Sequence, residues 1–564
     1  MKRKHLYICL ICLLCLVSRA SAQDSSLLSA IAELCGVGDP EDIPPEELER
    51  YMHYASHPLR INQAGEARLL SSGILSQYQA ASITDYRRNE GDVLSFSELA
   101  ALDGFGEAFV KAIASFISLS SGSVPGTPAD SVRNIRSTLQ TKGGIREDFG
   151  KGGKPETTYG FKYVLEADRG WEIGIAARSG FSEPAFPPAS YGFSTAIYPG
   201  HGAWKIIAGD FNARFGQGLA LWSGMVIDSY SSIASFYRRP GGLSPSYSWS
   251  STATHRGLAA DFTAGHFTVS SFVSAEGLRE KMQGKRNARI QYMPGLNLGW
   301  RWSHSTVSCT GVWKKDSGLT GSMEGRASLW GCDLFAEGVY VCGQPRTPPE
   351  IKAAGGLVFP LGKGRSAVRA EWKSGSLWRG AAGFENGSFV FSAEYRYQME
   401  KERHQTKLFV RKKLEISESL SLTLRGTCRW RPYEGDPVRI SFRGDLAWKG
   451  DAWQALGRVE YVHCRKNGVL TYAEFGRQGE KFFFWVRGTW YSTDGWTDRI
   501  YCYERDAPGN FNVPAYYGNG TGASLYGGYA PGRGRGGMLI KTYARLWFRS
   551  PGMSLLNMTL RAEF

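Results

Sequence analysis

The sequence of 564 residues lacks most of the features that mark a helical membrane protein or an enzyme. Its apolar run Leu6–Val17 is twelve residues long, whereas a helix needs about 20 residues to cross a bilayer. HExxH, GxSxG and P-loop motifs are missing, so the chemistry that depends on them has no sequence support. The 69 glycines follow no collagen period, and 42% hydrophobic residues are too many for a disordered chain.

Cysteine is also scarce, and no CxxC pair that could hold zinc lies outside the first 22 residues. His53 and His57 have the i, i+4 spacing of helical metal ligands, but Pro58 ends that segment and no third ligand accompanies them. We therefore expect no metal and no cofactor, and disulfide pairing cannot be deduced from the spacing. Beyond residue 22 the cysteines are Cys35, Cys309, Cys332, Cys342, Cys428, Cys464 and Cys502.

The amino-terminal segment has the three parts of an export signal. Lys2, Arg3 and Lys4 precede the apolar run, and Ala20-Ser21-Ala22 forms a small-x-small cleavage site. We expect residues 1–22 to be a signal peptide and the mature chain to begin at Gln23. A retained anchor is the alternative, which the short apolar run disfavours.

Residues 23–121 form a region with a helical pattern and a strongly acidic charge. Fifteen acidic residues stand against six basic ones, a net charge of −9. Residues 122–132 are rich in Ser, Gly and Pro and are expected to be a linker to a second domain. The expected helices cover residues 46–55, 65–71, 76–89, 97–102 and 107–119.

From residue 133 onward the apolar residues recur with a period of two. In Leu420–Trp430, Val438–Lys449 and Ile540–Arg549, one face is apolar and the other carries Ser, Thr, Arg, Asp and Lys. Segments of about ten residues match a bilayer when strands tilt by about 45°. The sequence therefore predicts a mainly β fold: a large antiparallel transmembrane barrel of about 20–24 strands over residues 133–564, preceded by a small all-α domain. A soluble β-sandwich or propeller is the alternative.

Aromatic residues support the membrane interpretation. The final strand ends on Phe564, with Met558, Leu560 and Ala562 on the same face, and it resembles the sorting signal of bacterial outer-membrane barrels. That resemblance implies a Gram-negative outer membrane, contact with its lipid, and recognition of the last strand by barrel-assembly machinery. The tryptophans expected in interfacial girdles are Trp372, Trp430, Trp448, Trp490 and Trp547.

Residues 58–117 resemble the tandem helix-hairpin-helix module of competence-type periplasmic DNA receptors. Leu102-Asp103-Gly104-Phe105-Gly106 matches the apolar-x-Gly-apolar-Gly turn of that module, and Ser71-Ser72-Gly73-Ile74-Leu75 matches it in part. Glycines there allow backbone N–H groups to approach a phosphate. The resemblance implies a periplasmic domain and a DNA site at Gly104 and Gly106, with Arg87, Arg88 and Lys111 as supporting charges. The acidic charge of the region argues instead for a packing or protein-docking role, because non-specific DNA affinity comes mainly from Lys and Arg.

The chain as a whole resembles a family of bacterial outer-membrane proteins in which this module is fused to a large barrel. Two stretches carry the resemblance: Gly209–Leu219, which contains Phe215-Gly216-Gln217-Gly218-Leu219, and Arg499–Gly518, which contains Tyr503-Glu504-Arg505-Asp506. The resemblance implies the architecture but no particular activity.

The region after residue 121 is basic, with 57 basic against 37 acidic residues. Arginines on the polar strand faces are expected to line the lumen, because arginine facing lipid at the midplane costs about 2–4 kcal/mol. Such a lumen would favour an anionic ligand, unless its arginines pair with Asp445, Glu460, Glu474 and Glu563 or lie at a rim. The acidic module is a further possible counter-charge. The predicted luminal residues are Arg425, Arg429, Arg439, Arg443, Arg487, Arg545 and Arg549.

Two functions are compatible with these patterns. One is a channel or uptake component for an anionic ligand, which includes DNA. The other is a non-conducting scaffold whose module docks periplasmic or secretion proteins. An enzyme is not expected; the i, i+2 pair Glu504 and Asp506 is the one arrangement that acid/base catalysis could use.

Overall fold

The computed structural model describes residues 25–121 and 135–563, apart from short gaps at 149–153, 168–169, 185, 200–202, 226–228, 250–253, 283–288, 303–304, 344–347, 480, 509, 511, 532–538 and 551. The predicted signal peptide 1–22, the predicted linker 122–132 and Phe564 lie outside the described residues. Within the described part, no helix is both long and apolar enough to span a membrane.

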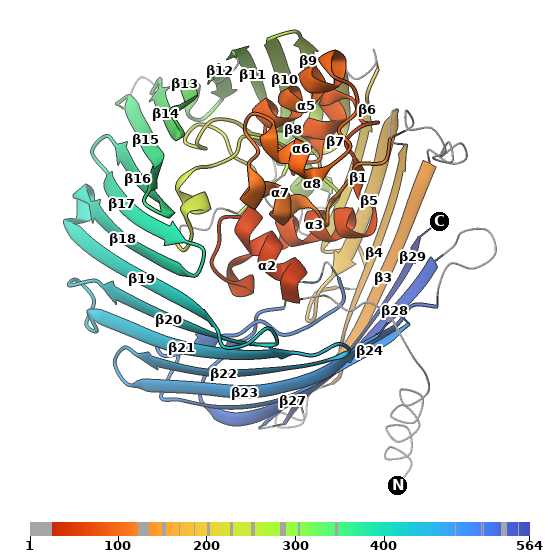
Figure 1. Ribbon diagram of the computed structural model, residues 1–564, viewed down its shortest axis with the longest axis vertical. Coiled ribbons are helices and arrows are strands. Elements are labelled where there is room, and N and C mark those ends of the chain that lie inside the picture. Colours follow the sequence, from red (N-terminus) through yellow and green to blue (C-terminus); the bar gives the residue numbers. More distant parts are fainter. Residues whose placement is uncertain are drawn as a thin grey trace.

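The chain after residue 134 forms one closed antiparallel barrel (Figure 1). In the described residues 24 strands make its wall, each paired with the next in the sequence. The last strand pairs with the first, from Met553 opposite Asp148 to Glu563 opposite Thr138, and this pairing closes the ring. A closed ring leaves no strand edge unpaired, which is what a sheet in lipid requires. The predicted fold class is confirmed.

The wall strands are β3 Ile135–Asp148, β4 Glu156–Ala167, β5 Trp171–Ser179, β6 Ser190–Ile197, β7 Trp204–Arg214, β9 His255–Ala264, β10 Phe267–Glu276, β11 Gln291–Trp302, β12 Ser305–Lys314, β13 Gly318–Leu329, β14 Cys332–Val341, β15 Glu350–Leu361, β16 Gly364–Lys373, β17 Leu377–Asn386, β18 Phe389–Gln398, β19 Arg403–Glu415, β20 Leu420–Trp430, β21 Val438–Lys449, β22 Trp453–His463, β23 Asn467–Gln478, β24 Phe482–Thr493, β27 Asn519–Tyr529, β28 Leu539–Arg549 and β29 Met553–Glu563.

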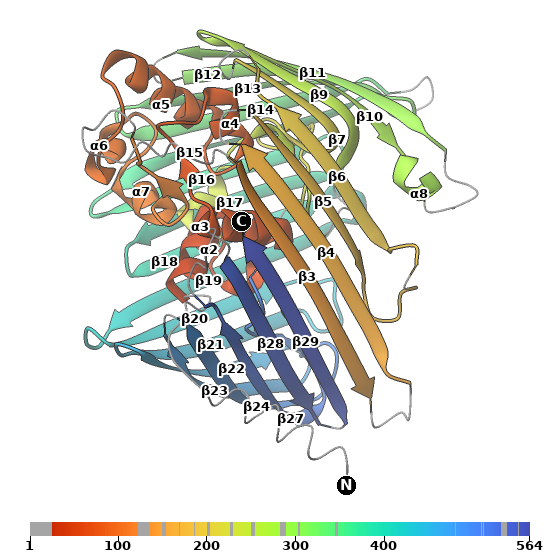
Figure 2. The ribbon, with the colours of Figure 1, turned by 90° about the vertical axis from the view of Figure 1, so that its right-hand side faces the viewer.

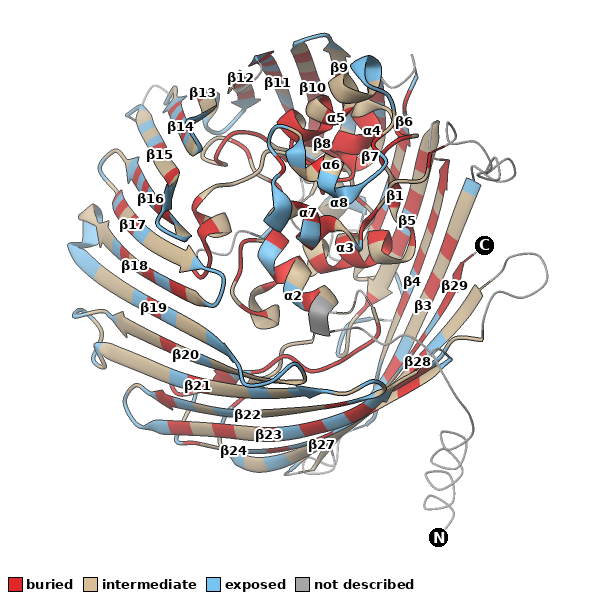
Figure 3. Ribbon diagram, in the orientation of Figure 1, coloured by how far each residue is buried: buried red, intermediate tan, exposed pale blue. Residues whose placement is uncertain are grey.

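The outer face of the wall is apolar and the inner face is polar, the reverse of a soluble protein. Figure 3 shows the resulting alternation of buried and exposed residues along the wall strands. The exposed side chains on adjacent strands β20 to β24 are Leu424, Phe442, Val459, Phe475 and Val486. On the other face of the same strands, the charged side chains of Arg443, Arg458, Glu474 and Arg487 are buried. An apolar belt around a closed polar-lined barrel is the architecture of outer-membrane proteins, so the chain is an outer-membrane barrel.

The tryptophan girdle needs one correction. Trp372, Trp430, Trp448 and Trp490 are exposed on the outer face. Trp547 is buried, and its Nε1 donates to the Glu504 carboxylate inside the lumen at 3.2 Å. Its position in β28 has the same parity as the luminal Arg545, so the strand's alternation directs it inward.

The two ends of the barrel differ. At the end where β3 begins and β29 finishes, turns are short: two residues separate β9 from β10, β15 from β16 and β17 from β18. The longest connections are at the other end: those from β7 to β9, from β24 to β27, and from β10 to β11, which carries α8 (Leu278–Met282). Short turns mark the periplasmic end of such barrels. Figure 2 shows α5, α6 and α7 at the end opposite α8.

The helical region lies in the periplasmic mouth of the barrel and extends into the lumen (Figures 1 and 2). The expected helix over 107–119 ends at Ile113, because Ile117–Ser118 (β2) pairs in parallel with Leu59–Arg60 (β1). We call residues 25–121 the plug. Its helices are α2 Ser25–Leu34, η1 Pro40–Asp42, α3 Pro45–Ser56, α4 Glu66–Ser71, α5 Gln77–Asn89, α6 Phe96–Ala101 and α7 Glu107–Ile113.

Two connections from the outer end fold back into the lumen and pack on the plug. The first joins β7 to β9 and contains η3 (Ile233–Phe236) and β8 (Gly242–Pro245). The second joins β24 to β27 and contains β25 (Ile500–Tyr501) and β26 (Ala515–Tyr516). We call them the first and second inner loops. They contain most of the two stretches by which the sequence resembles an outer-membrane family.

The apolar belt can be tested at Phe442, which is 60% exposed in the middle of β21. We expect Phe442→Arg to lower the free energy of unfolding from lipid vesicles by about 2–4 kcal/mol, because it places a charge at the midplane. Phe442→Leu, which stays apolar, should change it by less than about 1.5 kcal/mol. Equal effects of the two substitutions, measured by urea titration, would contradict a lipid-facing position.

Candidate functional site: the plugged lumen

The inner wall carries a cluster of arginines on three neighbouring strands. Arg425 on β20 and Arg443 on β21 are direct cross-strand partners, and Arg458 on β22 lies opposite Asp445. Like charges directly opposite each other destabilise a sheet. Asp445 compensates part of this charge, since its carboxylate accepts from Nε of Arg443 at 2.6 Å and from Nε of Arg458 at 2.5 Å. One carboxylate cannot balance three guanidinium groups, so further carboxylates are needed to neutralise the cluster.

The plug supplies these carboxylates from η1. Asp39 pairs with Arg425 and, at 3.3 Å, with Arg443. Glu41 pairs with Arg458 and, at 3.5 Å, with Arg443. We call these five residues the η1 cluster. Because the plug and the wall meet through buried charges of opposite sign, an acidic segment closes a basic lumen.

The electrostatics of η1 favour ionised acids. Burial opposes ionisation of Asp39, but Arg425 and Arg443 outweigh it and hold the pKa of Asp39 below its ordinary value. Burial likewise opposes ionisation of Glu41, and Arg458 and Arg443 lower the pKa of Glu41 despite it. The third acid behaves differently: burial, together with Asp39 and Glu41, raises the pKa of Asp42 to about 6 although Arg425 opposes the shift.

Ion pairs on the opposite side of the ring hold the rest of the plug. Three of them join plug acids to wall bases, and Arg68 reverses the polarity by pairing with two wall acids. The pairs are Glu47–Arg214 at 2.6 Å, Glu49–Lys162 at 3.0 Å, Glu66–Arg301 at 3.1 Å, Arg68–Glu166 at 2.7 Å and Arg68–Glu172 at 2.6 Å. Contacts on β4, β5, β7 and β11 as well as on β20 to β22 mean that the plug bridges the lumen.

The remaining predicted luminal arginines fall into two groups. Arg487 pairs with Glu474 at 2.5 Å, and Arg545 pairs with Glu504; all four side chains are buried. The alternative in which luminal acids pair with the luminal arginines therefore holds in part, because Asp445 pairs with Arg443 and Arg458, and Glu474 pairs with Arg487. Arg549 donates to the Tyr491 hydroxyl at 2.9 Å and to the Ala515 carbonyl at 3.1 Å.

Arg429 and Arg439 lie at the outer opening, where they line a cavity of about 530 Å³ with Arg431 and Arg499. Arg439 donates to the Arg499 carbonyl at 3.0 Å. Two acids, Glu434 and Asp436, share the cavity. The outer vestibule is thus basic independently of the plug.

The inner loops are fastened by carboxylates that receive several donors. Glu504 of the second inner loop accepts from Arg545, Tyr516 and Trp547. This buried structural position leaves Glu504 in a role unlike that of an acid/base catalyst facing a substrate. The sequence named Glu504 and Asp506 only as the spacing that acid/base catalysis could use, and it could not show that the loop which carries them folds inward.

The first inner loop wraps a carboxylate of the wall. Glu337 on β14 accepts from the backbone N–H groups of Leu219 at 3.1 Å and Ala220 at 3.3 Å. Gly216 has φ +62°, and a Cβ there would lie 2.6 Å from the Glu337 carboxyl carbon. The glycine in Phe215-Gly216-Gln217-Gly218-Leu219 is therefore required by this close approach. The sequence analysis identified the motif but not its partner.

The predicted nucleic-acid residues lie on the plug but do not form one basic surface. α6 and α7 form a hairpin in the periplasmic mouth, with Gly104 at φ +83° and Gly106 at φ +81°, both exposed. Arg87 donates to the carbonyls of Ala64 at 2.7 Å and Ile61 at 3.1 Å, so it fastens the plug internally.

The other two predicted bases are exposed beside acids. Arg88 is 69% exposed and lies 3.7 Å from Asp85. Lys111 is exposed on α7, the helix that begins with the exposed Glu107, and Asp103 is exposed in the hairpin turn. The surface around the turn between α6 and α7 is therefore more acidic than basic.

The rings of His53 and His57 stack on each other, with 5.4 Å between their centroids. His53 lies 3.4 Å from Glu166, and burial together with His53 lowers the pKa of His57 to about 2. Across residues 25–121 and the described part of 135–563, no three His, Cys, Asp or Glu side chains are grouped as metal ligands. The seven cysteines beyond the predicted signal peptide have free thiols.

Solved bacterial outer-membrane proteins align with the chain over about three quarters of its length. The P pilus usher PapC translocation pore aligns over 76% of this chain and 99% of its own, with 9% identity and a TM-score of 0.41. OprD of Pseudomonas aeruginosa covers 76% of this chain and 94% of its own, with 9% identity and a TM-score of 0.27. OpdK of the same organism covers 76% and 98%, with 8% identity and a TM-score of 0.29. No protein-family model and no curated protein sequence matches the chain. These values are too low to support an argument about function.

The η1 cluster predicts the effect of removing its plug acids. The double variant Asp39→Asn/Glu41→Gln leaves wall arginines without two of their carboxylates, and removing one side of a buried pair costs about 3–5 kcal/mol. We expect the plug amides to exchange hydrogen faster while the barrel amides keep their protection. Glu107→Gln removes an exposed plug acid and is the matched control. Unchanged plug exchange in the double variant would contradict an anchoring role.

The pKa shifts predict that plug protection has an optimum in pH. Asp42 has a raised folded pKa, so its contribution is present at low pH and is lost as the pH rises through about 6. Asp39 and Glu41 have lowered folded pKa values, so their contribution is lost only as the pH falls below the ordinary carboxyl range of about 4. The protection of the plug amides, corrected for the intrinsic exchange rate at each pH, should be greatest near pH 4 and should fall from there to about pH 6. In Asp42→Asn the high-pH loss should vanish and the low-pH loss should remain; the opposite pattern would refute the assignment.

Proposed function

We propose that the protein is a gated outer-membrane channel for an anionic ligand, closed by its plug. The observation that carries the proposal is the η1 cluster, in which Asp39 and Glu41 occupy wall arginines that an anionic ligand would use. Acids held on these arginines can be exchanged for the carboxylates or phosphates of a solute. The contacts that close the lumen are therefore the ones that a ligand can replace.

The size of the barrel and its outer vestibule support the same proposal. Barrels of 16–18 strands already enclose aqueous channels, so a 24-strand barrel needs an internal closure to keep the membrane tight. The arginine-rich vestibule at the outer opening would concentrate anions before they reach the plug.

A more specific form of this proposal takes DNA as the anionic ligand. The α6–α7 hairpin in the periplasmic mouth presents Gly104 and Gly106 where an arriving strand would emerge. Its acidic neighbours Asp103 and Glu107 oppose phosphate. A DNA fragment that binds the full-length protein with an affinity that falls as salt rises would support DNA; no binding at low salt would leave smaller anions as the ligand class.

The scaffold function remains the second candidate because of one feature of the plug. Leu94 and Phe96 are 58% and 41% exposed on the segment that leads into α6, near the acidic hairpin turn. An apolar patch beside acids suits a periplasmic protein with a basic surface.

Conductance separates the two functions. In planar bilayers we expect the wild-type protein to be mostly closed and Asp39→Asn/Glu41→Gln to open more often, because the plug loses charged anchors. Under a KCl gradient the reversal potential of the open state should show preference for chloride, since removing plug acids leaves the lumen more basic. Glu107→Gln should behave as wild type. If neither Asp39→Asn/Glu41→Gln nor Glu107→Gln conducts while the barrel stays folded, the result would favour the scaffold function.

A further inference from the structure

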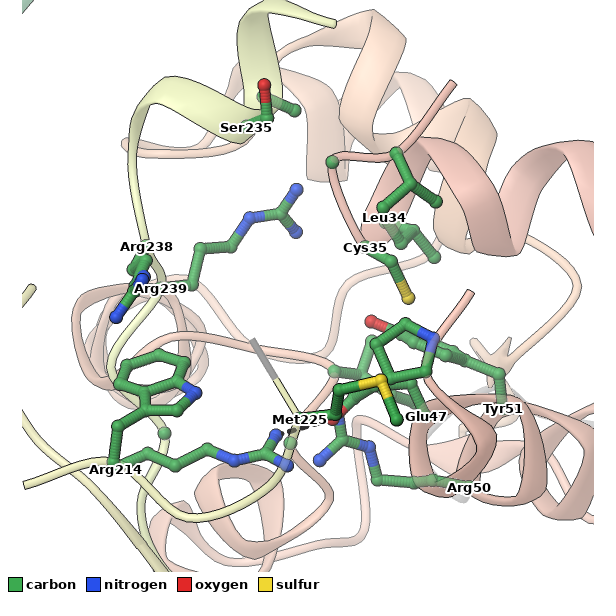
Figure 4. Close-up of a pocket in the computed structure, with 18 of the residues that line it drawn as sticks. Leu34, Cys35, Glu47, Arg50, Tyr51, Arg214, Met225, Ser235, Arg238 and Arg239 are labelled. Atoms are coloured by element: carbon green, nitrogen blue, oxygen red, sulfur yellow. Dashed lines mark hydrogen bonds and ion pairs between the residues drawn. The ribbon is translucent and has the colours of Figure 1, made fainter. Parts of the chain in front are cut away.

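A second cluster of arginines surrounds a cavity between the plug and the first inner loop (Figure 4). The cavity has a volume of about 150 Å³. From the plug it is lined by the end of α2 and by α3, and from the wall and loop by the end of β7 and the segment that follows η3. The cavity therefore exists only while the plug is seated.

Four guanidinium groups line this cavity, and one carboxylate is shared between two of them. Glu47 pairs with Arg50 and, at 2.6 Å, with Arg214. Arg238 stacks over Trp222 at 5.6 Å. Arg239 extends toward Leu34 and Cys35 in Figure 4.

Arg239 is the least compensated of the four. It lies over the Phe109 ring of α7 at 4.7 Å, and in the described part of the chain no carboxylate forms an ion pair with it. The Nε of Arg50 is buried without a hydrogen-bond partner. Two of the four guanidinium groups, those of Arg50 and Arg239, therefore keep donor capacity that Glu47 does not take up.

Burial shifts the pKa of three other titratable groups close to these arginines. Burial raises the pKa of the Cys35 thiol to about 12, so the thiol stays neutral. Burial also raises the pKa of Glu46, with Arg214 opposing the shift, and that of Glu33, with Glu385 adding to the shift and Arg239 opposing it. In the lining itself, four guanidinium groups face one carboxylate, that of Glu47.

We propose that this cavity binds a small oxyanion, a phosphate or carboxylate group, which clamps the plug to the first inner loop. Arginine matches such groups through paired N–H donors. The volume accommodates one small oxyanion with a few waters. Because the plug and the loop both contribute arginines, the anion binds the closed lumen and favours it by linkage. The inference goes beyond the proposed channel, in which an anion displaces plug acids, by assigning a separate site where an anion holds the plug in place.

The test is calorimetric titration of inorganic phosphate into the full-length protein in detergent, with acetate as the carboxylate probe. We expect Arg239→Gln to weaken binding of the preferred probe by about tenfold or more, because it removes the charge and the paired N–H donors that an oxyanion would bind. Phe109→Leu removes the ring over Arg239 but keeps the charge and should bind as wild type. Arg365→Gln removes an arginine 57% exposed at a periplasmic turn and is the matched control.

Several outcomes decide the matter. Equal affinity in wild type and Arg239→Gln, or binding of neither probe to wild type, overturns the anion site. A loss of affinity confined to Arg239→Gln, with slower plug hydrogen exchange when the probe is present, supports it. Binding needs no conduction, so a scaffold that never opens would still bind the probe, and a channel that opens could lack the site. If Arg239→Gln does not fold, Arg239→Lys keeps the charge but loses the paired donors and should still weaken binding.

Discussion

The closed lumen depends on the placement of like charges next to each other on the barrel wall. Arg425 and Arg443 face each other across β20 and β21, an arrangement that a sheet does not tolerate unless anions lie between the two. Asp445 comes from the wall, whereas Asp39 and Glu41 come from a segment about 400 positions away in the sequence. The barrel and the plug are therefore not independent: the wall has a charge pattern that only the seated plug completes.

The barrel could be predicted closely because its two faces meet different solvents. β20 and β21 begin and end at the residues expected from the alternation, since lipid on one side and charged lumen on the other leave little ambiguity at each position. Trp547 shows the limit of this reasoning. Its type suggested a girdle position, but its parity in β28 directs it inward to Glu504, and parity outweighs residue type in a strand.

The site was harder to predict because it consists of contacts between distant segments. The excess of acids in 23–121 and of bases in the barrel indicated complementary charge, but no local pattern pairs Glu41 with Arg458. The inner loops were missed for a related reason: a connection that folds back into a polar lumen has the polar composition of any surface loop. Gly216 was a local signal of a close approach in this loop. The sequence could not show that the approaching group is Glu337, because Glu337 lies on a distant strand.

A plug held by ion pairs, unlike an apolar plug, can be released by an anion that competes for its arginines. Buried guanidinium groups cannot be left without a partner, because an unpaired buried charge is strongly unfavourable. Withdrawal of Asp39 and Glu41 therefore has to be accompanied by water or by an arriving anion that takes over Arg425, Arg443 and Arg458. An arriving anion restores more of the lost interaction than water does, so opening becomes more favourable as anions reach the η1 cluster. A competing ligand then has to match the negative charge of Asp39 and Glu41.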